Sequence, residues 1–314
     1  MSCGEITYED LKRRQAFPLN VKIKLTQERI KQWYEHWDGQ VYVSFSGDKD
    51  STVLVDIVKS MYPDVPAVFC DTGLEYPEVR ELAIRKADVV LKPEMTFKAV
   101  LEHYGYPIPS KEQAYFIRQA RHSTPRTRAL RLGDGRYSVS SKWRYLLDAP
   151  FEISEKCCDV MKKKPFRKFE RERELKRMTA MMASESSLRE RQYMQRGCNA
   201  FTDKNPSSMP MAVWTEQDVL RYIVDNGIEY ASCYGEIIED ASGKLHCTKE
   251  DRTGCMFCMF GIQYDGEPNR FQRMERDYPK QYDYCINKLG IGRVLDYVGI
   301  PYKYQPTLFD SVSV

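Results

Sequence analysis

The amino-acid sequence predicts an α/β fold in which a parallel sheet carries helices on both faces. Between residues 26 and 91, short runs rich in β-branched and aromatic residues alternate with helical patterns. This alternation is typical of a parallel sheet with helical crossovers. Hydrophobic residues make up 42% and charged residues 30% of the 314 residues, as in globular proteins with a buried core.

The first third of the chain supplies the expected elements in order. Residues 26–38 place apolar side chains at helical spacing. The next helix is expected to end before Pro63, because the residue that precedes a proline disfavours the helical conformation. The remaining expected elements are strands at 41–45, 65–70 and 88–91 and helices at 52–61 and 78–87.

The rest of the chain is less regular. A basic, irregular segment is expected at 107–150, and a strongly charged segment with helical stretches at 160–196. Residues 206–226 are expected to form a connection and another helix. The segment 232–268 is rich in loops and cysteines, and a final helical region is expected near 269–298.

The loop after the first predicted strand has the setting of a phosphate site. The loop is Ser46-Gly47-Asp48-Lys49-Asp50-Ser51, and it precedes a helix whose unpaired N–H groups and dipole attract phosphate. Gly47 permits close backbone approach, the serine hydroxyls can donate, and Lys49 adds positive charge. The pattern GxxxxGK[ST] is absent, which excludes an ordinary P-loop NTPase. An ordinary capped strand-to-helix turn is the alternative interpretation.

The aspartates of this loop need a reason to lie at an anion site. Asp50 can cap the helix N-terminus or hold Mg²⁺, whose phosphate sites commonly use one or two carboxylates. Asp48 can adopt the left-handed backbone conformation better than most residues. A second loop, Asp71-Thr72-Gly73, follows the second predicted strand. Both loops leave the carboxyl ends of strands, where ligands of such sheets bind, and Asp71 is expected to hold Mg²⁺ or a hydroxyl.

These two loops resemble those of a known family. The first is similar to the SGGKDS pyrophosphate loop of the adenine nucleotide α-hydrolase-like proteins. The second, Cys70 to Glu78, resembles the DTGxxFPET stretch of the phosphoadenosine phosphosulfate (PAPS) reductase branch. The resemblance implies a Rossmann-like sheet with an adenine nucleotide across its carboxyl end. Asp48 departs from the glycine of the family motif.

The resemblance also implies a set of site residues. Segment 184–189 is similar to the family's "R..ES..R" segment, although its first arginine has no match here. A solvated, charged helix is the alternative for residues 184–196. The implied domains are an adenine-nucleotide-binding domain at 25–230 and a C-terminal cysteine-bearing helical and loop region at 231–314. The implied catalytic residues are Lys49, Asp50 and Asp71. The implied nucleotide-binding residues are Ser44, Ser46, Gly47, Asp48, Lys49, Asp50, Ser51, Asp71, Thr72, Gly73, Glu185 and Arg189.

Ten cysteines are many for such a chain, and in the cytosol they indicate metal binding or catalysis rather than disulfides. Cys157 and Cys158 are adjacent, and Cys255 and Cys258 form a CxxC. The resemblance to the iron–sulfur reductases of the family implies a [4Fe–4S] cluster on these four. Structural zinc is the alternative, although adjacent cysteines suit the four irons of a cubane better. Cys247 could replace one of the pair or remain a free thiol.

The resemblance favours one reaction over two others. The family's reductases attack the sulfonate with a cysteine near the C-terminus, and no cysteine follows Cys285 here. We therefore expect ATP-dependent sulfur transfer, in which Mg·ATP adenylates an acceptor oxygen, pyrophosphate leaves, and sulfur displaces AMP. The alternatives are a PAPS or adenylyl-sulfate (APS) reductase that produces sulfite and a non-catalytic nucleotide-binding partner subunit.

Partners and location are expected from charge and hydropathy. The net charge is only +3, but basic residues gather at 118–144 and could track a nucleic-acid acceptor. Scattered, solvated arginines are the alternative, and a sulfur-donor protein is a further expected partner. No apolar run approaches the roughly 20 residues of a membrane span. Residues 1–5 lack the apolar core of a secretory signal, so we expect a cytoplasmic protein.

Overall fold

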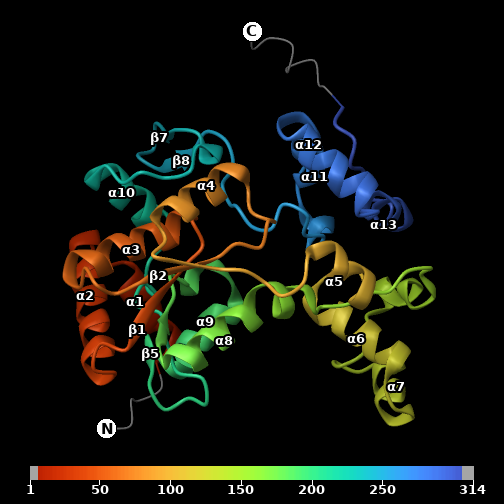
Figure 1. The fold of residues 1–314 in the computed structure, drawn as a ribbon, viewed down its shortest axis with the longest axis horizontal. Helices are drawn as coiled ribbons and strands as arrows, with labels where there is room; N and C mark the ends of the chain where they lie inside the picture. The colour runs from red at the N-terminus through yellow and green to blue at the C-terminus, as the bar shows by residue number, and fades with distance from the viewer. Residues whose placement is uncertain (1–5, 306–314) are drawn as a thin grey trace. The chain divides into compact units, whose positions relative to one another are not determined.

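The computed structural model describes residues 6–305, so residues 1–5 and the last nine lie outside the described part. Contacts divide the chain (Figure 1) into two units, each built from two separate segments. Unit 1 comprises Met1–Lys92 and Pro165–Thr253, and unit 2 comprises Pro93–Lys164 and Gly254–Val314. This division differs from a single boundary at residue 230, and the extent of each functional domain stays a prediction.

Unit 1 contains a six-stranded sheet in the order β3-β2-β1-β4-β6-β5. Every neighbouring pair is parallel except β5–β6. The predicted α/β class with a parallel sheet is therefore confirmed. The strands are β1 (Val41–Phe45), β2 (Ala67–Cys70), β3 (Val89–Leu91), β4 (Lys176–Met178), β5 (Asn199–Ala200) and β6 (Ser207–Ser208).

Helices surround this sheet. The longest, α2, has 18 residues, and no helix among residues 6–305 is long and apolar enough to cross a membrane. A two-stranded hairpin of β7 (Ile237–Glu239) and β8 (Leu245–Cys247) completes the unit. The helices are α1 (Tyr8–Gln15), α2 (Leu19–His36), α3 (Lys49–Met61), α4 (Pro77–Lys86), α8 (Lys164–Arg173), α9 (Ser187–Arg196) and α10 (Glu216–Asn226), with short turns η3 (Ala183–Glu185) and η4 (Ser232–Tyr234).

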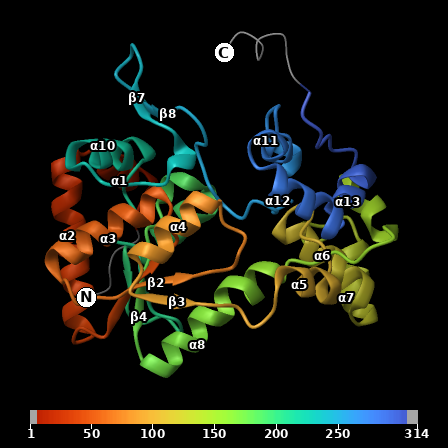
Figure 2. The same cartoon turned by 45° about the horizontal axis from the view of Figure 1, so that its top comes forward.

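The central strand β1 packs on both of its faces, because side chains alternate along a strand. Val43 and Phe45 join the main core, which includes residues of α2, α3 and α10. Tyr42 points the other way and packs with Val68 and with Phe169 of α8. Figure 2 shows α3 and α8 on opposite sides of the strands. Burial on both faces explains why β1 reads as a nearly continuous apolar run.

Unit 2 is built mainly of helices. The prediction of an irregular segment at 107–150 was wrong, because α6 and α7 lie within it. Ala114, Ile117 and Ala120 of α6 are buried at a spacing of three residues, and Ser110 caps the helix. The elements are α5 (Phe97–Tyr104), α6 (Lys111–His122), α7 (Pro125–Leu132), η1 (Ser141–Asp148), η2 (Asp159–Lys163), η5 (Ile262–Tyr264), α11 (Arg270–Asp277), α12 (Pro279–Asp283), η6 (Tyr284–Lys288) and α13 (Ile291–Val298).

Candidate functional site

The loop after β1 is closed by its own side chains. The carboxylate of Asp48 accepts the backbone N–H of Ser51 at 2.9 Å, and the Ser46 hydroxyl donates to the same carboxylate at 2.8 Å. Asp48 is therefore the N-cap of α3, with an extended backbone at φ −76°. The cap expected at Asp50 and the left-handed backbone expected at Asp48 were both wrong. Gly47 takes the left-handed conformation instead, at φ +78°.

Gly47 also sets how closely the loop approaches α4. A Cβ atom added at this position would lie 2.7 Å from the carbonyl oxygen of Val79 and 2.8 Å from the Cβ of Ala83. Both distances are shorter than van der Waals contact allows. The loop therefore depends on glycine here for space as well as for conformation.

Lys49 is 5% exposed and reaches into the second segment of unit 1. Its Nζ lies 3.3 Å from a carboxylate oxygen of Glu216 and donates to the backbone carbonyl of Asp251 at 3.0 Å. The Sγ of Cys247 lies 3.3 Å away, and the Tyr234 ring centroid lies 4.7 Å away. Residues 216–251 thus form the wall around the loop lysine. No spacing in the sequence predicts Glu216 or Tyr234 in this role.

Asp50 is the acidic residue of the loop whose carboxylate is left available. Burial raises the pKa of Asp50 to about 7, and the charge of Asp48 raises it as well, while Lys49 and Arg252 act in the opposite direction. Within residues 6–305, no hydrogen bond or ion pair engages this carboxylate. Burial lowers the pKa of Arg189, and the charge of Asp50 opposes that effect. The structure thus brings the predicted Arg189 into the electrostatic environment of the loop.

Arg189 arrives there through the segment that follows β4. The Ser186 hydroxyl caps α9 by accepting the N–H of Arg189 at 3.3 Å, and Glu185 forms an ion pair with Arg189. β4 lies beside β1, on the side opposite β2. The two loops therefore leave the sheet where the strand order reverses, the place where open α/β sheets bind ligands.

The loop after β2 is held by an ion pair. Both carboxylate oxygens of Asp71 accept from Arg80, with Nε and Nη2 each at 2.7 Å. These hydrogen bonds lower the pKa of Asp71. The hydroxyl of Thr72 donates to Glu75 at 2.6 Å. Arg80 thus engages both oxygens of Asp71 and holds the loop, and the Mg²⁺ or hydroxyl role of Asp71 stays a prediction.

The remaining predicted nucleotide residues lie along the same edge. Ser44 is half-buried within β1, with its backbone paired to Val68. The backbone N–H of Ser46 donates to the Ser51 hydroxyl at 3.1 Å. Gly73 has φ +70° and open space beside its Cα, so this turn is accessible to a ligand.

Four of the predicted metal-binding cysteines belong to unit 2. The thiols of Cys157 and Cys158 lie 4.0 Å apart. Their hydrogen bond raises the pKa of Cys157 and lowers that of Cys158 to about 5. The charges of Cys255 and Cys258 further raise the pKa of Cys157. The structure thus brings the pair and the CxxC into one neighbourhood, although about 100 residues separate them in the chain.

The arrangement of these thiols bears on the kind of metal they could hold. Among the described residues, no group of three or more His, Cys, Asp or Glu side chains converges on a position for a metal ion. Four thiols from two segments are a donor set that suits a [4Fe–4S] cluster or a structural zinc ion. The kind of metal that these cysteines bind stays a prediction.

Arg270 supports the CxxC turn. Its guanidinium forms a two-pronged ion pair with Asp265, with both distances 2.7 Å. The same guanidinium donates to the backbone carbonyl of Cys258 at 3.0 Å. Lys111 lowers the pKa of the Cys258 thiol, against the larger, opposite effect of burial. Burial thus raises the pKa of Cys258, while the charges of Arg270 and Lys111 act in the opposite direction.

The other cysteines separate into two kinds. Cys233 and Cys285 are buried, as expected for small hydrophobic residues. Cys247 belongs to unit 1, where burial raises the pKa of its thiol and Lys49 acts in the opposite direction. The structure thus associates Cys247 with the phosphate loop.

Several arginines of the basic segment 118–144 form hydrogen bonds and ion pairs within unit 2. Arg118 pairs with Glu155 through two hydrogen bonds of 2.7 and 3.0 Å. Arg121 donates to four backbone carbonyls between residues 146 and 151. Arg131 is buried and donates to Gln119 at 2.7 Å. These arginines brace the fold, and a nucleic-acid acceptor stays a prediction.

Comparisons with known proteins agree on one family. A model described as the phosphoadenosine phosphosulfate reductase domain matches residues 40–259. The adenosine 5′-phosphosulfate reductase of Staphylococcus epidermidis is 22% identical over 288 residues, which cover 87% of this chain and 93% of the relative. The enzyme of the same name from Anoxybacillus flavithermus is 24% identical over 233 residues, with 72% and 81% covered. The solved PAPS reductase of Candida auris, a phosphate complex, is similar at 14% identity with a TM-score of 0.40, covering 76% of this chain and 97% of that one.

Proposed function

Because the chain belongs to the phosphoadenosine phosphosulfate reductase domain family, we propose that it binds an adenylyl anhydride at the loop after β1 and uses it in sulfur chemistry. The matched residues, 40–259, contain this loop, the Asp71 loop and all five predicted cysteines. Of the reactions that such a site could carry out, ATP-dependent sulfur transfer is our first proposal.

The available carboxylate of Asp50 supports ATP as the nucleotide. The carboxylate of Asp48 is hydrogen-bonded as the helix cap, and that of Asp71 is hydrogen-bonded to Arg80. No described residue hydrogen-bonds to the carboxylate of Asp50. A magnesium–triphosphate complex brings the cation that such a carboxylate requires. Asp50 would hold Mg²⁺, and the ion would neutralise the departing pyrophosphate.

The chain's own residues would position and stabilise the phosphates. The first N–H groups of a helix lack partners within the helix, so the start of α3 would favour an anion, although the Ser51 N–H is already bonded to Asp48. Lys49 and Arg189 supply positive charge close to the loop. In the proposed reaction an acceptor oxygen attacks the α-phosphorus and the bond to pyrophosphate breaks. The loop donors stabilise the negative charge that develops on the phosphate oxygens.

The four cysteines of unit 2 are proposed to hold a [4Fe–4S] cluster. Two observations support it: the thiols of Cys157 and Cys158 lie 4.0 Å apart, and the charges of Cys255 and Cys258 act on the pKa of Cys157. When bound, such a cluster would supply an iron on which sulfur can be carried, or electrons. Arg270 would hold the CxxC turn in place through the carbonyl of Cys258.

The test is a product assay with ATP and Mg²⁺ on metal-replete protein. We expect AMP and pyrophosphate to form. No acceptor is added, because hydrolysis of ATP by water gives the same two products and is sufficient for detection. The Lys49→Ala variant should lose most of this activity, because the loop loses its buried cation. Lys24→Ala, which removes an exposed lysine of α2, is the matched control. Absence of AMP and pyrophosphate from replete wild-type protein would overturn the proposal.

A second candidate, reduction of adenylyl sulfate, is favoured by Cys247. Its thiol lies 3.3 Å from Lys49 Nζ, and the two named relatives are reductases of this substrate. In this reaction the Cys247 thiolate would attack the sulfonate sulfur, and the bond to AMP would break. A dithiol reductant would then release sulfite, becoming a disulfide while Cys247 is regenerated.

The two candidates give different products. With adenylyl sulfate and dithiothreitol, the reductase releases sulfite, and without the dithiol it accumulates a Cys247 adduct heavier by one SO₃ group. Cys247→Ser should abolish both products, whereas Cys198→Ser, in the same unit, should not. Sulfite release that persists in Cys247→Ser protein would exclude this thiol as the nucleophile.

A further inference from the structure

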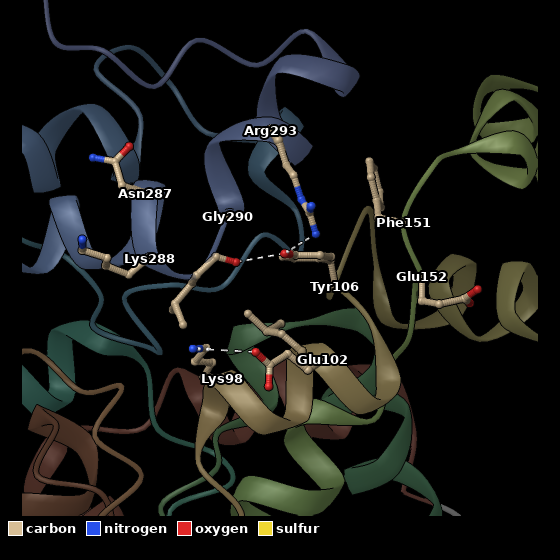
Figure 3. Close-up of a pocket in the computed structure, with 11 residues that line it drawn as sticks. Lys98, Glu102, Tyr106, Phe151, Glu152, Asn287, Lys288, Gly290 and Arg293 are labelled. Carbon is tan, nitrogen blue, oxygen red and sulfur yellow. Dashed lines mark hydrogen bonds and ion pairs between the residues drawn. The ribbon is translucent and has the colours of Figure 1, made fainter.

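A cavity of about 410 Å³ lies within unit 2 (Figure 3), and no cysteine lines it. Its walls come from α5, from the chain near Tyr106 and Phe151, and from the junction of η6 and α13. The volume falls in the range of small-molecule sites, roughly 300–1,000 Å³. All of its lining residues belong to unit 2, and none of them is a residue of the function proposed above.

Arg293 supplies an unpaired cation to this cavity. Its Nη2 donates to the hydroxyl of Tyr106 at 3.0 Å, and its guanidinium lies 5.5 Å from the centroid of the Tyr106 ring. No carboxylate within residues 6–305 forms an ion pair with Arg293. A guanidinium carries five N–H donors in a fork that suits planar oxyanions. Most of these donors remain available to a ligand.

The acids around the cavity already have cations of their own. Glu102 pairs with Lys98 at 3.8 Å, and Glu152 pairs with Arg121 at 3.7 Å. Lys288, the last residue of η6, lines the cavity and forms no ion pair with a described residue. Lys288 and Arg293 thus bring positive charge to the η6–α13 junction, and Figure 3 draws their side chains on different parts of the cavity wall.

The Tyr106 hydroxyl makes this arrangement rigid. It donates to the backbone carbonyl of Leu289 at 2.9 Å while it accepts from Arg293. Gly290, at φ +67°, stands directly beside it, and a Cβ there would lie 3.1 Å from the hydroxyl oxygen. The guanidinium is thus anchored before any ligand arrives, and a preorganised site binds at lower entropic cost.

Apolar side chains line the same cavity beside Arg293. Tyr106 and Phe151 pack edge to face, with ring centroids 5.8 Å apart, and Leu101 and Leu289 are also buried there. Small-molecule sites combine such walls with a few convergent polar groups. We propose that this cavity binds a small organic oxyanion, a carboxylate or phosphate carried on an apolar body, with Arg293 as its anchor.

Titration calorimetry on the full chain tests the proposal with four probes. Phenyl phosphate and benzoate carry both the charge and the ring, inorganic phosphate carries the charge alone, and benzyl alcohol carries the ring alone. We expect one or both of the aromatic anions to bind tightest and benzyl alcohol not to bind measurably. Binding should persist in Lys49→Ala protein, which separates this cavity from the phosphate loop.

The variants identify the anchor. Arg293→Gln should weaken binding of the preferred probe about tenfold or more, because a hydrogen-bonded charge pair is lost, and Lys288→Gln should weaken it less. Arg126→Gln, which removes an exposed arginine of α7 in the same unit, is the matched control. Thermal melts of each variant separate loss of ligand from loss of fold. Undiminished binding in Arg293→Gln, equal binding of benzyl alcohol, or no binding of any probe would overturn the proposal.

Discussion

The residues of the phosphate loop show how far residue type predicts a role. The sequence pattern correctly marked Gly47 and Lys49, because a strand-to-helix loop needs a flexible residue and an anion needs a cation. It left Asp50 as either the helix cap or a Mg²⁺ ligand, and the structure shows that Asp48 makes the cap. Both aspartates lie at the start of α3. The backbone conformation after Gly47 decides which carboxylate caps the helix, and sequence spacing does not predict that conformation.

Replacing Gly47 by alanine should destabilise unit 1 strongly. The new Cβ would collide with Val79 and Ala83 while the backbone holds a left-handed conformation. We expect a loss of about 2–4 kcal/mol in the free energy of unfolding, measured by urea denaturation. Gly73→Ala is the control, since it has similar φ but open space beside it, and it should lose only about 1–2 kcal/mol. Equal losses in the two variants would show that crowding at Gly47 is unimportant.

The ion pair between Asp71 and Arg80 predicts a pH dependence. The folded state lowers the pKa of Asp71 from 3.8, so its stabilisation is present above that pH and is lost as the pH falls through the lowered value. Because Arg80 is half-exposed, we expect Asp71→Asn to cost about 1–2 kcal/mol at pH 7.

The measurement is the urea midpoint of wild type and Asp71→Asn from neutral to acid pH. The difference between them should narrow as the pH falls below 3.8. Asp225→Asn, at an exposed position of α10, should match wild type throughout. A difference that stays constant down to the lowest pH at which the protein folds would contradict the assignment of the ion pair.

At the level of elements, the sequence predicted long or strongly patterned segments and missed short ones. The three strands β1, β2 and β3 lie within their predicted ranges. β4, by contrast, has only Lys176-Arg177-Met178, and its one apolar side chain gives no alternation to detect. The helices α6 and α7 were missed because they are rich in arginine, which is typical of a charged loop. Several of these arginines instead form hydrogen bonds within the unit.

The CxxC turn offers an element-level prediction. Arg270 joins Asp265 to the carbonyl of Cys258, so Arg270→Gln should loosen this turn without removing a thiol. If a cluster is bound, the variant should lose its visible absorbance on dilution or exposure to air faster than wild type. Arg276→Gln, on α11 of the same unit, is the control. Equal rates of loss in Arg270→Gln and wild type would remove the positioning role of Arg270.

At the level of the whole molecule, the chain visits unit 2 twice. The pair Cys157 and Cys158 arrives in the first visit, and the CxxC in the second. The resemblance predicted that these cysteines would act together, and the structure places them in one unit. The interleaving of the units could not be predicted, because it depends on contacts between segments that are far apart in sequence, and local patterns carry no such information.

The metal content of the intact chain is a prediction at this scale. Protein prepared without oxygen should be brown and hold about four irons, as a [4Fe–4S] cluster requires. Cys157→Ser and Cys258→Ser should each lower the iron content, measured by elemental analysis and electron paramagnetic resonance after reduction. Cys198→Ser, at a position in unit 1, should retain it. Stoichiometric zinc with no iron would instead establish the zinc alternative.

The way the chain crosses between its two units constrains how it can be dissected. Truncation after Thr253 keeps both segments of unit 1. It leaves Pro93–Lys164 as an insertion without Gly254–Val314, the second segment of unit 2. Isolating the sheet would need a second operation, a splice that joins Lys92 to Pro165. Conversely, producing unit 2 alone in the same chain order would need a splice that joins Lys164 to Gly254. Simple deletion series would therefore yield misfolded fragments, whereas such spliced designs respect the architecture.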